Sequence, residues 1–254
     1  MQRYFVPVEQ YGDDSVVLLG DDAHHASRVM RMRAGDSFIA SDGKGREALV
    51  KASAVSSDRV EGTIVEQLSA DREPAWQITI AQSLPKGDKM ELIIQKGTEI
   101  GAYAFIPFES ERMIVQYDAK KEAKRLERWA KIAKEAAEQA HRSRVPDIVK
   151  PASWKQLLGM MGDYDLVLFC YEEEGRAGTG GGLRGALEPL KNRRDVRALV
   201  VVGPEGGFTD KEAEDARTAG AVVVGLGKRI LRTETAGFVA LTALLYESGE
   251  MGGN

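Results

Sequence analysis

The sequence has few of the side chains that bind metals or form cross-links. It contains one cysteine, Cys170, and three histidines, His24, His25 and His141. A single cysteine cannot form an internal disulfide or supply a cysteine-based zinc site, and three histidines leave little for a histidine cluster. We therefore expect no metal centre.

Long apolar runs are also missing. No stretch approaches the roughly 18 uncharged apolar residues of a membrane span, and Met1–Tyr11 lacks the apolar core of a signal peptide. We therefore expect a cytoplasmic protein with no membrane partner. The composition, 43% hydrophobic and 29% charged in 254 residues, is that of a globular chain with one large or two modest domains.

The chain has no large excess of one charge, but its charges are unevenly distributed. The formal net charge is -4. Residues 1–72 hold 9 basic and 12 acidic side chains, a balance of -3, whereas residues 112–150 hold 11 and 6, a balance of +5. The second segment could meet a phosphate backbone, or it could be the solvated face of a helix.

The first part of the chain has the pattern of a small β-rich domain. Short β-type runs are separated by turn signals such as the glycine-rich turn at residues 42–45. The runs are Val16–Leu19, Ser37–Ala40, Ala48–Val55 and Val60–Val65. The polar segment 66–76 is the expected linker. We predict one domain over residues 1–70 and a second over residues 74–254.

In the second domain strands alternate with helices, which predicts an open α/β sheet. The expected strands are Ile78–Gln82, Phe105–Pro107, Leu166–Phe169, Ala198–Val202 and Ala221–Val224. Helices should begin at Asp88 and Thr209, each with a glutamate three residues on, and end at Gly101 and Gly220. Ligands of such sheets lie beyond the carboxyl ends of the strands.

Two further helices are expected, and their apolar residues suggest how they pack. The helix over residues 119–141 should bury one face, formed by Ala123, Leu126, Ala130, Ala133, Ala137 and Ala140. The last helix, from Glu234 to about Ser248, is apolar nearly all round. It must therefore be buried in the domain or in a subunit interface.

The segment Gly180–Gly185 matches the G-x-G-x-x-G fingerprint of dinucleotide-binding proteins. That fingerprint needs a strand directly before it, yet ten residues separate Gly180 from the end of the expected strand at Phe169. Segments rich in glycine match the pattern by accident. We interpret the segment as a flexible loop.

Two other glycine-rich segments directly follow expected strands. Gly203–Phe208 follows the strand ending at Val202, and its glycines allow a ligand to approach the backbone. Gly225–Ala236 leads into the last helix, which Thr233 or Thr235 could cap. Either segment alone could be an ordinary turn. Together they favour a ligand site.

These segments belong to a set of motifs that makes the sequence resemble a known family, the bacterial small-subunit ribosomal RNA uridine-N3 methyltransferases of the SPOUT superfamily. The motifs span nearly the whole chain. They are Arg3–Phe5, Leu84–Gly87, Gln95–Gly101, Glu109–Arg112, Glu135–Gln139, Gly203–Phe208 and Ile230–Ala236.

The resemblance implies an α/β protein in which an N-terminal PUA-like RNA-binding β-barrel precedes a SPOUT domain with a C-terminal deep trefoil knot. It further implies a homodimer that binds S-adenosylmethionine and acts on 16S ribosomal RNA or the small ribosomal subunit. The residues expected to bind the cofactor are Val202, Gly203, Pro204, Glu205, Gly206, Gly207, Leu226, Gly227, Ile230, Leu231, Arg232, Thr233, Thr235 and Ala236.

Two side chains are candidates for the chemistry of uridine methylation. Glu234 could accept the imide proton of the uracil or orient the base, and Arg232 could stabilise the charge that appears on the uracil oxygen or hold a phosphate. The residues expected to meet RNA phosphates are Arg3, Arg28, Arg31, Lys86, Arg112 and Arg142.

Two other functions stay open at this point. One is a SPOUT methyltransferase that acts on a ribose 2'-hydroxyl or on a transfer RNA base. The other is an RNA-binding assembly factor without activity. Both glycine-rich segments are retained together with Arg232 and Glu234, which speaks against the second.

Overall fold

The computed structural model describes residues 1–69, 72–173 and 182–251, and the chain divides into two compact units. Unit 1 consists of Met1–Glu73 and Lys134–Val145, and unit 2 of Pro74–Ala133 and Pro146–Asn254. Unit 1 is therefore not continuous in sequence. It includes residues 134–145, which the expected boundary at residues 70–74 assigns to the second domain.

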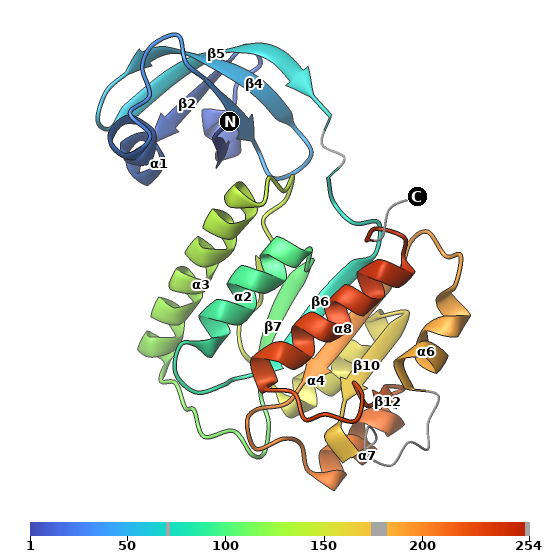
Figure 1. Cartoon of the computed structure of the whole chain (residues 1–254). Helices are drawn as coiled ribbons and strands as arrows, with labels where there is room; N and C mark the ends of the chain where they lie inside the picture. Colours follow the sequence, from blue (N-terminus) through green and yellow to red (C-terminus); the bar gives the residue numbers. More distant parts are fainter. Residues whose placement is uncertain (70–71, 174–181, 252–254) are drawn as a thin grey trace. The chain divides into compact units, whose positions relative to one another are not determined.

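Unit 1 is built on a curled five-stranded sheet (Figure 1). The strands are β1 (Arg3–Phe5), β2 (Ser15–Leu19), β3 (Ser37–Ser41), β4 (Glu47–Val55) and β5 (Arg59–Leu68), in the order β1-β3-β4-β5-β2. β1 pairs with β3 in parallel, and the other pairs are antiparallel. The expected strands are confirmed, and β5 extends into the expected linker.

Alternating side chains on these strands form the core of unit 1. Val16 and Leu18 of β2 are buried together with Phe38, Val50 and Val60, because successive side chains of a strand point to opposite faces. Between β2 and β3 lie α1 (Gly20–His24) and a π-helical turn (His25–Val29), and a 3-10 turn (Val8–Gln10) precedes β2.

Unit 2 contains a parallel sheet in the order β12-β10-β11-β6-β7-β8, with β9 paired to β7. Its strands are β6 (Gln77–Ser83), β7 (Ala104–Glu109), β8 (Asp147–Ile148), β9 (Ala152–Ser153), β10 (Leu166–Cys170), β11 (Arg197–Val202) and β12 (Val222–Val224). The central strands are apolar runs buried on both faces, as in other parallel sheets covered by helices.

Helices cover both faces of this sheet. They are α2 (Lys89–Ile100), α3 (Ala119–Gln139), α4 (Trp154–Met160), α6 (Gly182–Leu187), α7 (Asp210–Thr218) and α8 (Thr233–Glu247), with 3-10 turns at Met161–Asp163 and Glu188–Leu190. α2 and α8 pack side by side on one face (Figure 1). Residues of α4 and α7 join the apolar cluster on the other.

Several expected helix signals are confirmed. Thr209 and Glu212 form the capping box of α7. The apolar stripe predicted for α2 was Met90, Ile93, Ile94, Gly97 and Ile100, of which the first four are buried and Ile100 is half-buried. Gly101 ends α2 with a φ of 125°, a conformation that favours glycine.

Other expectations were wrong in detail. The side chain of Asp88 accepts no capping hydrogen bond from the described backbone, although Asp88 precedes α2. In α3, Trp129, Ala133, Ala136 and Ala137 are buried, whereas Ala123 and Ala130 are exposed. The buried face is therefore rotated toward the bulky Trp129, which buries far more apolar area than an alanine.

The glycine-rich segment at Gly180–Gly185 falls partly outside the described residues. Residues 180 and 181 are among those not described, whereas residues 182–185 begin α6 and are helical rather than a loop.

Of the helices in the described ranges, none combines the length and apolar character needed to cross a membrane.

Candidate functional site

A cavity of about 670 Å³ lies at the carboxyl ends of β10, β11 and β12, within the size range of small-molecule sites. Three chain segments that follow these strands supply most of its wall. The lining residues are Lys89, Arg112, Cys170, Tyr171, Glu172, Glu173, Val202–Phe208, Leu226, Gly227, Arg229–Thr233 and Ala236. This is the edge of a parallel sheet at which ligands bind.

The backbone of the segment after β11 passes close to its neighbours. A Cβ atom added at Gly206 would lie 3.2 Å from Arg112 Cβ and 3.3 Å from the Arg112 carbonyl oxygen. Arg112 also donates a hydrogen bond from Nη1 to the Gly206 carbonyl oxygen at 3.2 Å. Arg112, which also lines the cavity, therefore holds this segment and leaves little room for a side chain at position 206.

Hydrogen bonds join this segment to β6 and α8. The Thr233 hydroxyl donates to the Gly203 carbonyl oxygen at 2.6 Å, and it accepts from Gln82 Nε2 at 2.9 Å. All three residues lie in different elements of unit 2. The predicted cap of α8 was wrong, because Arg232 is the N-cap residue and the Thr233 hydroxyl is used for this link.

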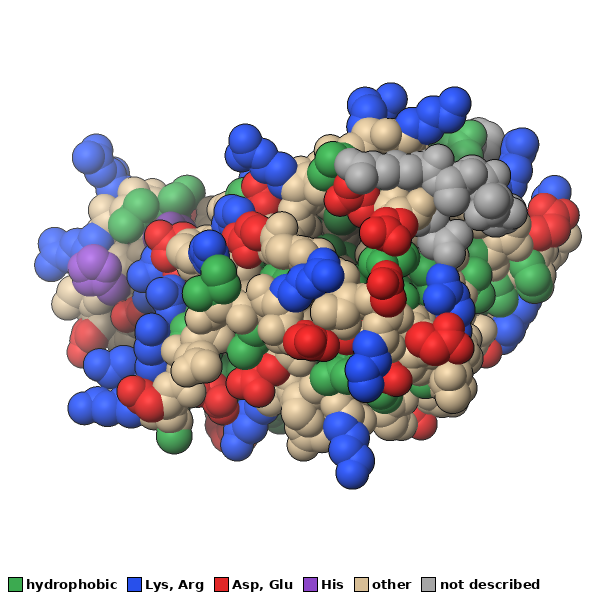
Figure 2. Space-filling model, turned by 90° about the horizontal axis from the view of Figure 1, so that it is seen from below, with side chains coloured by type: hydrophobic (Ala, Val, Ile, Leu, Met, Phe, Trp, Pro, Cys, Tyr) green, Lys and Arg blue, Asp and Glu red, His purple; other side chains and the backbone are tan. Residues whose placement is uncertain are grey.

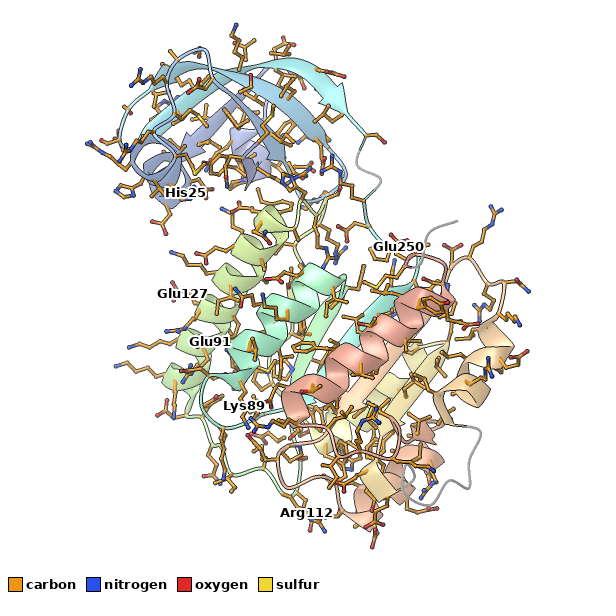
Figure 3. The ribbon with its side chains drawn as sticks, in the orientation of Figure 1. His25, Lys89, Glu91, Arg112, Glu127 and Glu250 are labelled. Carbon is orange, nitrogen blue, oxygen red and sulfur yellow. The ribbon has the colours of Figure 1, made fainter. Side chains whose placement is uncertain are left out.

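Charged side chains of both signs surround the cavity, and Figure 2 shows basic and acidic side chains interspersed on this end of the molecule. Lys89, in the first turn of α2 (Figure 3), donates from Nζ to Glu205 Oε1 at 2.7 Å and lies 3.8 Å from Glu234 Oε2. Burial raises the pKa of Glu205, but the hydrogen bonds from Lys89 and from backbone N–H groups outweigh it and hold this pKa below its usual value.

The structure brings most of the expected cofactor residues together. The whole of residues 202–207 lines the cavity, as do Leu226, Gly227 and residues 230–233. Ala236 of α8 also lines it. Glu234 and Thr235 lie in the first turn of α8 with Thr233 and Ala236, but they are not among the described residues that line the cavity.

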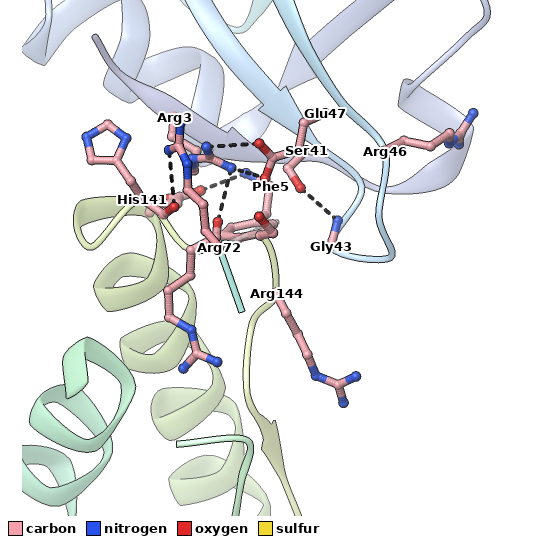
Figure 4. Close-up of polar contacts among 12 residues, drawn as sticks. Arg3, Phe5, Ser41, Gly43, Arg46, Glu47, Arg72, His141 and Arg144 are labelled. Atoms are coloured by element: carbon pink, nitrogen blue, oxygen red, sulfur yellow. Dashed lines mark hydrogen bonds and ion pairs between the residues drawn. The ribbon is translucent and has the colours of Figure 1, made fainter. Parts of the chain in front are cut away.

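Two of the expected RNA-binding residues are not on the surface, and these predictions were wrong. Arg3 is 1% exposed and forms an ion pair with Glu47 in which both side chains are fully buried (Figure 4). Arg142 is 5% exposed and pairs with Glu73. The residue type alone does not reveal these acidic partners. Glu47 lies 44 residues from Arg3 in the sequence, and Glu73 lies 69 residues from Arg142.

These two arginines hold unit 1 together. Arg3 Nη1 donates to the Arg142 carbonyl oxygen at 3.0 Å, and the Phe5 backbone N–H donates to Glu138 Oε1 at 2.9 Å. Glu73 Oε1 also accepts from the backbone N–H of Ser143 at 2.9 Å.

The other four residues expected to bind RNA, Arg28, Arg31, Lys86 and Arg112, are exposed.

Sequence reasoning missed several lining residues. Cys170, Tyr171, Glu172 and Glu173 follow β10 and could have been found by applying the rule of strand ends to this strand as well. Burial raises the pKa of the Cys170 thiol to about 12, so the thiol stays protonated at neutral pH and is a poor nucleophile. No pattern in the sequence indicated that Lys89 would line the cavity.

Among the described residues, no group of three or more potential metal ligands occurs.

Comparison with known protein families gives two matches. Residues 71–245 match the family described as an RNA methyltransferase domain, and residues 18–65 match the family described as an RNA methyltransferase PUA domain. The second match includes β3 and β4 and most of β5 of the curled sheet of unit 1.

Similar proteins cover nearly the whole chain. A relative named "Ribosomal RNA small subunit methyltransferase E", from Bacillus subtilis (strain 168), is 43% identical over 251 residues, which are 98% of this chain and 97% of the relative. A crystal structure of a protein of that name from Neisseria gonorrhoeae, bound to S-adenosyl methionine, is 31% identical with a TM-score of 0.83 and 97% of each chain covered. A methyltransferase from Legionella pneumophila in complex with the same cofactor is 29% identical with a TM-score of 0.85 and 96% of each chain covered.

Proposed function

The chain belongs to the ribosomal RNA small subunit methyltransferase E family, and we propose that it transfers a methyl group from S-adenosylmethionine to N3 of a uridine in 16S ribosomal RNA. The observation that carries this function is the cavity between the two glycine-rich segments, in a chain similar over nearly its whole length to methyltransferases of this kind. The alternatives, another RNA target or a factor without activity, are outcomes of the test below.

The residues around the cavity fit S-adenosylmethionine. The volume of the cavity suits a nucleoside-sized ligand, and Gly203, Gly206 and Gly207 line it without side chains that would keep a ligand from the backbone. The interspersed charges of Lys89, Glu205 and Arg232 suit a ligand that carries both an ammonium and a carboxylate. When bound, the cofactor supplies a methyl group on a sulfonium, which is already a strong electrophile.

Two side chains would then serve the uracil. N3 carries a proton that must leave as the N–CH3 bond forms, and Glu234 is the proposed acceptor of that proton. Arg232 is exposed at the N-cap of α8 and lines the cavity. Its guanidinium would stabilise the negative charge that the uracil oxygens gain, or hold a neighbouring phosphate.

We propose that RNA is bound through phosphate contacts from both units. Arg28 and Arg31 of unit 1 are exposed next to Val29 and Met30, which are 61% and 47% exposed. Lys86 and Arg112 are exposed in unit 2, and Arg112 lines the cavity. Such contacts would make the affinity for RNA fall with added salt.

We also propose a homodimer that works in the cytoplasm, where small ribosomal subunits are available. α8 leaves Val239 and Tyr246 exposed, at 39% and 67%, and α2, which packs against it, exposes Leu92 at 41%. A second copy could cover these apolar side chains. Sedimentation at micromolar concentration tests this, and a stable monomer would contradict it.

The trefoil knot and the 1–70 and 74–254 domain boundaries stay predictions.

The experiment that tests the function is mapping of modified nucleotides in total RNA, including 16S ribosomal RNA and transfer RNA, from a strain that lacks the gene. We expect one uridine to lose its N3 methyl group and to regain it when purified protein and S-adenosylmethionine are added to small subunits. Loss of a ribose methylation or of a transfer RNA modification would favour another target. Intact modification together with defective subunits would favour an assembly factor.

A further inference from the structure

We propose that Lys228 and Arg229 form a phosphate-binding site at the edge of the cavity, where they hold the RNA backbone next to the uridine that is methylated. This inference rests on the function proposed above and deepens it, because it assigns a part of the RNA substrate to the segment between β12 and α8. The phosphate contacts proposed above come from other residues. The new site is therefore a separate contact with the same substrate.

Lys228 and Arg229 lie in the segment 225–232, which joins β12 to α8 and belongs to neither a strand nor a helix (Figure 1). Both residues are exposed, and Arg229 lines the cavity. Gly227 comes just before them with a φ of 106°, a conformation that favours glycine. After the segment, the hydroxyl of Thr233 is hydrogen-bonded to β6 and to the segment after β11. The pair is therefore placed at the cavity between two defined points of the backbone.

The folded chain does not neutralise these two cations. Within residues 1–69, 72–173 and 182–251, no hydrogen bond or ion pair involves either side chain. Their charges add to the charge of Arg232 and to the partial positive charge at the N-terminal end of α8. Because like charges that lie close together repel one another, the segment is less stable without an anion beside it. Such a cluster is suited to an anionic ligand.

The anion that fits is the RNA rather than the cofactor. S-adenosylmethionine carries a sulfonium and an ammonium against one carboxylate, so its net charge is positive, and Arg232 already offers a cation to that carboxylate. Two additional cations would repel such a ligand. RNA carries a negative charge on each phosphate, and the guanidinium of Arg229 can donate two parallel hydrogen bonds to one of them. The charges of this segment therefore match an RNA backbone that runs past the cavity.

The two residues would contact different parts of that backbone. Arg229 lines the cavity, so a phosphate bound to it belongs to a nucleotide near the methyl donor. Lys228 is exposed but is not among the described lining residues, so it would bind the backbone outside the cavity. Phosphate contacts fix the register of an RNA without reading its sequence. Loss of the pair should therefore weaken RNA binding and leave cofactor binding unchanged.

The test compares the double variant Lys228→Gln, Arg229→Gln with the double variant Lys191→Gln, Arg194→Gln. Lys191 and Arg194 are exposed and, within the described residues, their side chains have no partner. They precede β11 and so lie toward its amino end, whereas the cavity is at its carboxyl end. The control thus removes the same charge from the opposite edge of the sheet. A third variant, Arg229→Lys, keeps the charge and removes the guanidinium.

Filter binding to 16S ribosomal RNA transcripts over a range of salt concentrations gives the affinity and its salt dependence. We expect Lys228→Gln, Arg229→Gln to bind about tenfold more weakly, or weaker still, at low salt. The slope of log affinity against log salt should become shallower by about one to two. Arg229→Lys should keep the slope, and the control should match the unsubstituted protein. Calorimetry should give one affinity for S-adenosylmethionine in all of them, at unchanged melting temperatures.

Two results of these binding measurements would overturn the proposal. One is an unchanged slope, or a slope that changes equally in the control. The other is weaker cofactor binding at an unchanged slope, which would assign Lys228 and Arg229 to the carboxylate of the cofactor.

Methylation kinetics show whether the contact lies next to the target. With small subunits as substrate, the double variant should raise KM by about tenfold and change kcat by less than about twofold. A KM equal to that of the unsubstituted protein would place the contact elsewhere and overturn the proposal. If the unsubstituted protein does not methylate small subunits, the proposed function fails, and the salt dependence of binding still decides whether Lys228 and Arg229 bind phosphate.

Discussion

The hydroxyl of Thr233 donates a hydrogen bond to the carbonyl oxygen of Gly203, which links the start of α8 to the segment after β11. Gln82 of β6 donates to the same hydroxyl, and Thr233 is only 8% exposed. The two segments that line the cavity are therefore fixed to each other before any ligand arrives.

Thr233→Val should loosen this link at nearly constant side-chain volume. The carbonyl of Gly203 and the amide of Gln82 would each lose one hydrogen-bond partner and keep another, which typically costs about 0.5–1.5 kcal/mol. Urea unfolding measures the loss, and calorimetry should show weaker cofactor binding. Thr242→Val, at an exposed position of α8, is the matched control and should change neither. Equal effects of the two variants would contradict the assignment.

Gly206→Val should abolish or strongly weaken binding of S-adenosylmethionine. The added side chain would meet Arg112 within 3.2–3.3 Å, so either Arg112 or the backbone segment must move. Calorimetry measures the affinity, with Gly159→Val as control because a Cβ atom there meets nothing within 4 Å. Unchanged affinity in Gly206→Val would show that the cofactor binds elsewhere.

Arg3→Met should destabilise unit 1 rather than weaken RNA binding directly. Removal of one partner of a buried ion pair leaves the other charge unpaired and typically costs about 3–5 kcal/mol. Arg3→Met with Glu47→Leu should recover most of that loss. Arg46→Met breaks an ion pair with Asp42 whose arginine is 44% exposed and should cost about 0–1 kcal/mol. Urea unfolding compares the three, and reduced RNA affinity at full stability would refute the structural role.

Arg28→Gln combined with Arg31→Gln should lower RNA affinity and its salt dependence. Each lost phosphate contact reduces the slope of log affinity against log salt by about one. Filter binding over a range of salt concentrations gives this slope. Arg59→Gln removes an exposed arginine that pairs with Glu61 in the same unit and should leave the slope unchanged. A slope that is the same in all proteins would exclude these contacts.

Unit 1 should become less stable as the pH rises toward 8. Burial raises the pKa of Glu138 from 4.5 to about 7, although the Phe5 backbone N–H donates to its carboxylate. Because the folded pKa is the higher one, the stability contribution is complete below pH 4.5 and is lost as the pH rises through 7.

Glu138→Gln removes this titration and retains an oxygen that can accept from Phe5. The variant and the unsubstituted protein should be about equally stable at pH 5, and the variant should be the more stable at pH 8 by about 1–3 kcal/mol. Urea unfolding at the two pH values measures the difference. The idea fails if that difference is the same at both.

Local patterns in the sequence predicted the elements well. The capping box of Thr209 and the end of α2 at Gly101 depend on neighbours within a few residues, so the sequence alone contains the needed information. The buried face of α3 could not be predicted in this way, because the alanines of the helix are compatible with two different buried faces. The single bulky side chain of Trp129 decides between them.

Only the part of the candidate site that depends on neighbouring residues in the sequence was predicted. The glycine-rich segments follow apolar strands, and both features are local. The roles of Arg3 and Lys89 depend on partners that lie 44 and 116 residues away, Glu47 and Glu205. No spacing rule connects such residues, so charge type alone suggested an RNA contact for Arg3 and nothing for Lys89.

The discontinuity of unit 1 affects the order in which the protein can fold during its synthesis. Arg3 and Phe5 belong to the first strand, but their partners Arg142 and Glu138 emerge from the ribosome much later. Translation therefore runs through the start of the catalytic domain before the amino-terminal sheet obtains its last contacts. A shortened gene ending at the predicted linker would encode a sheet without them, and such a fragment would be a poor substitute for the intact unit 1.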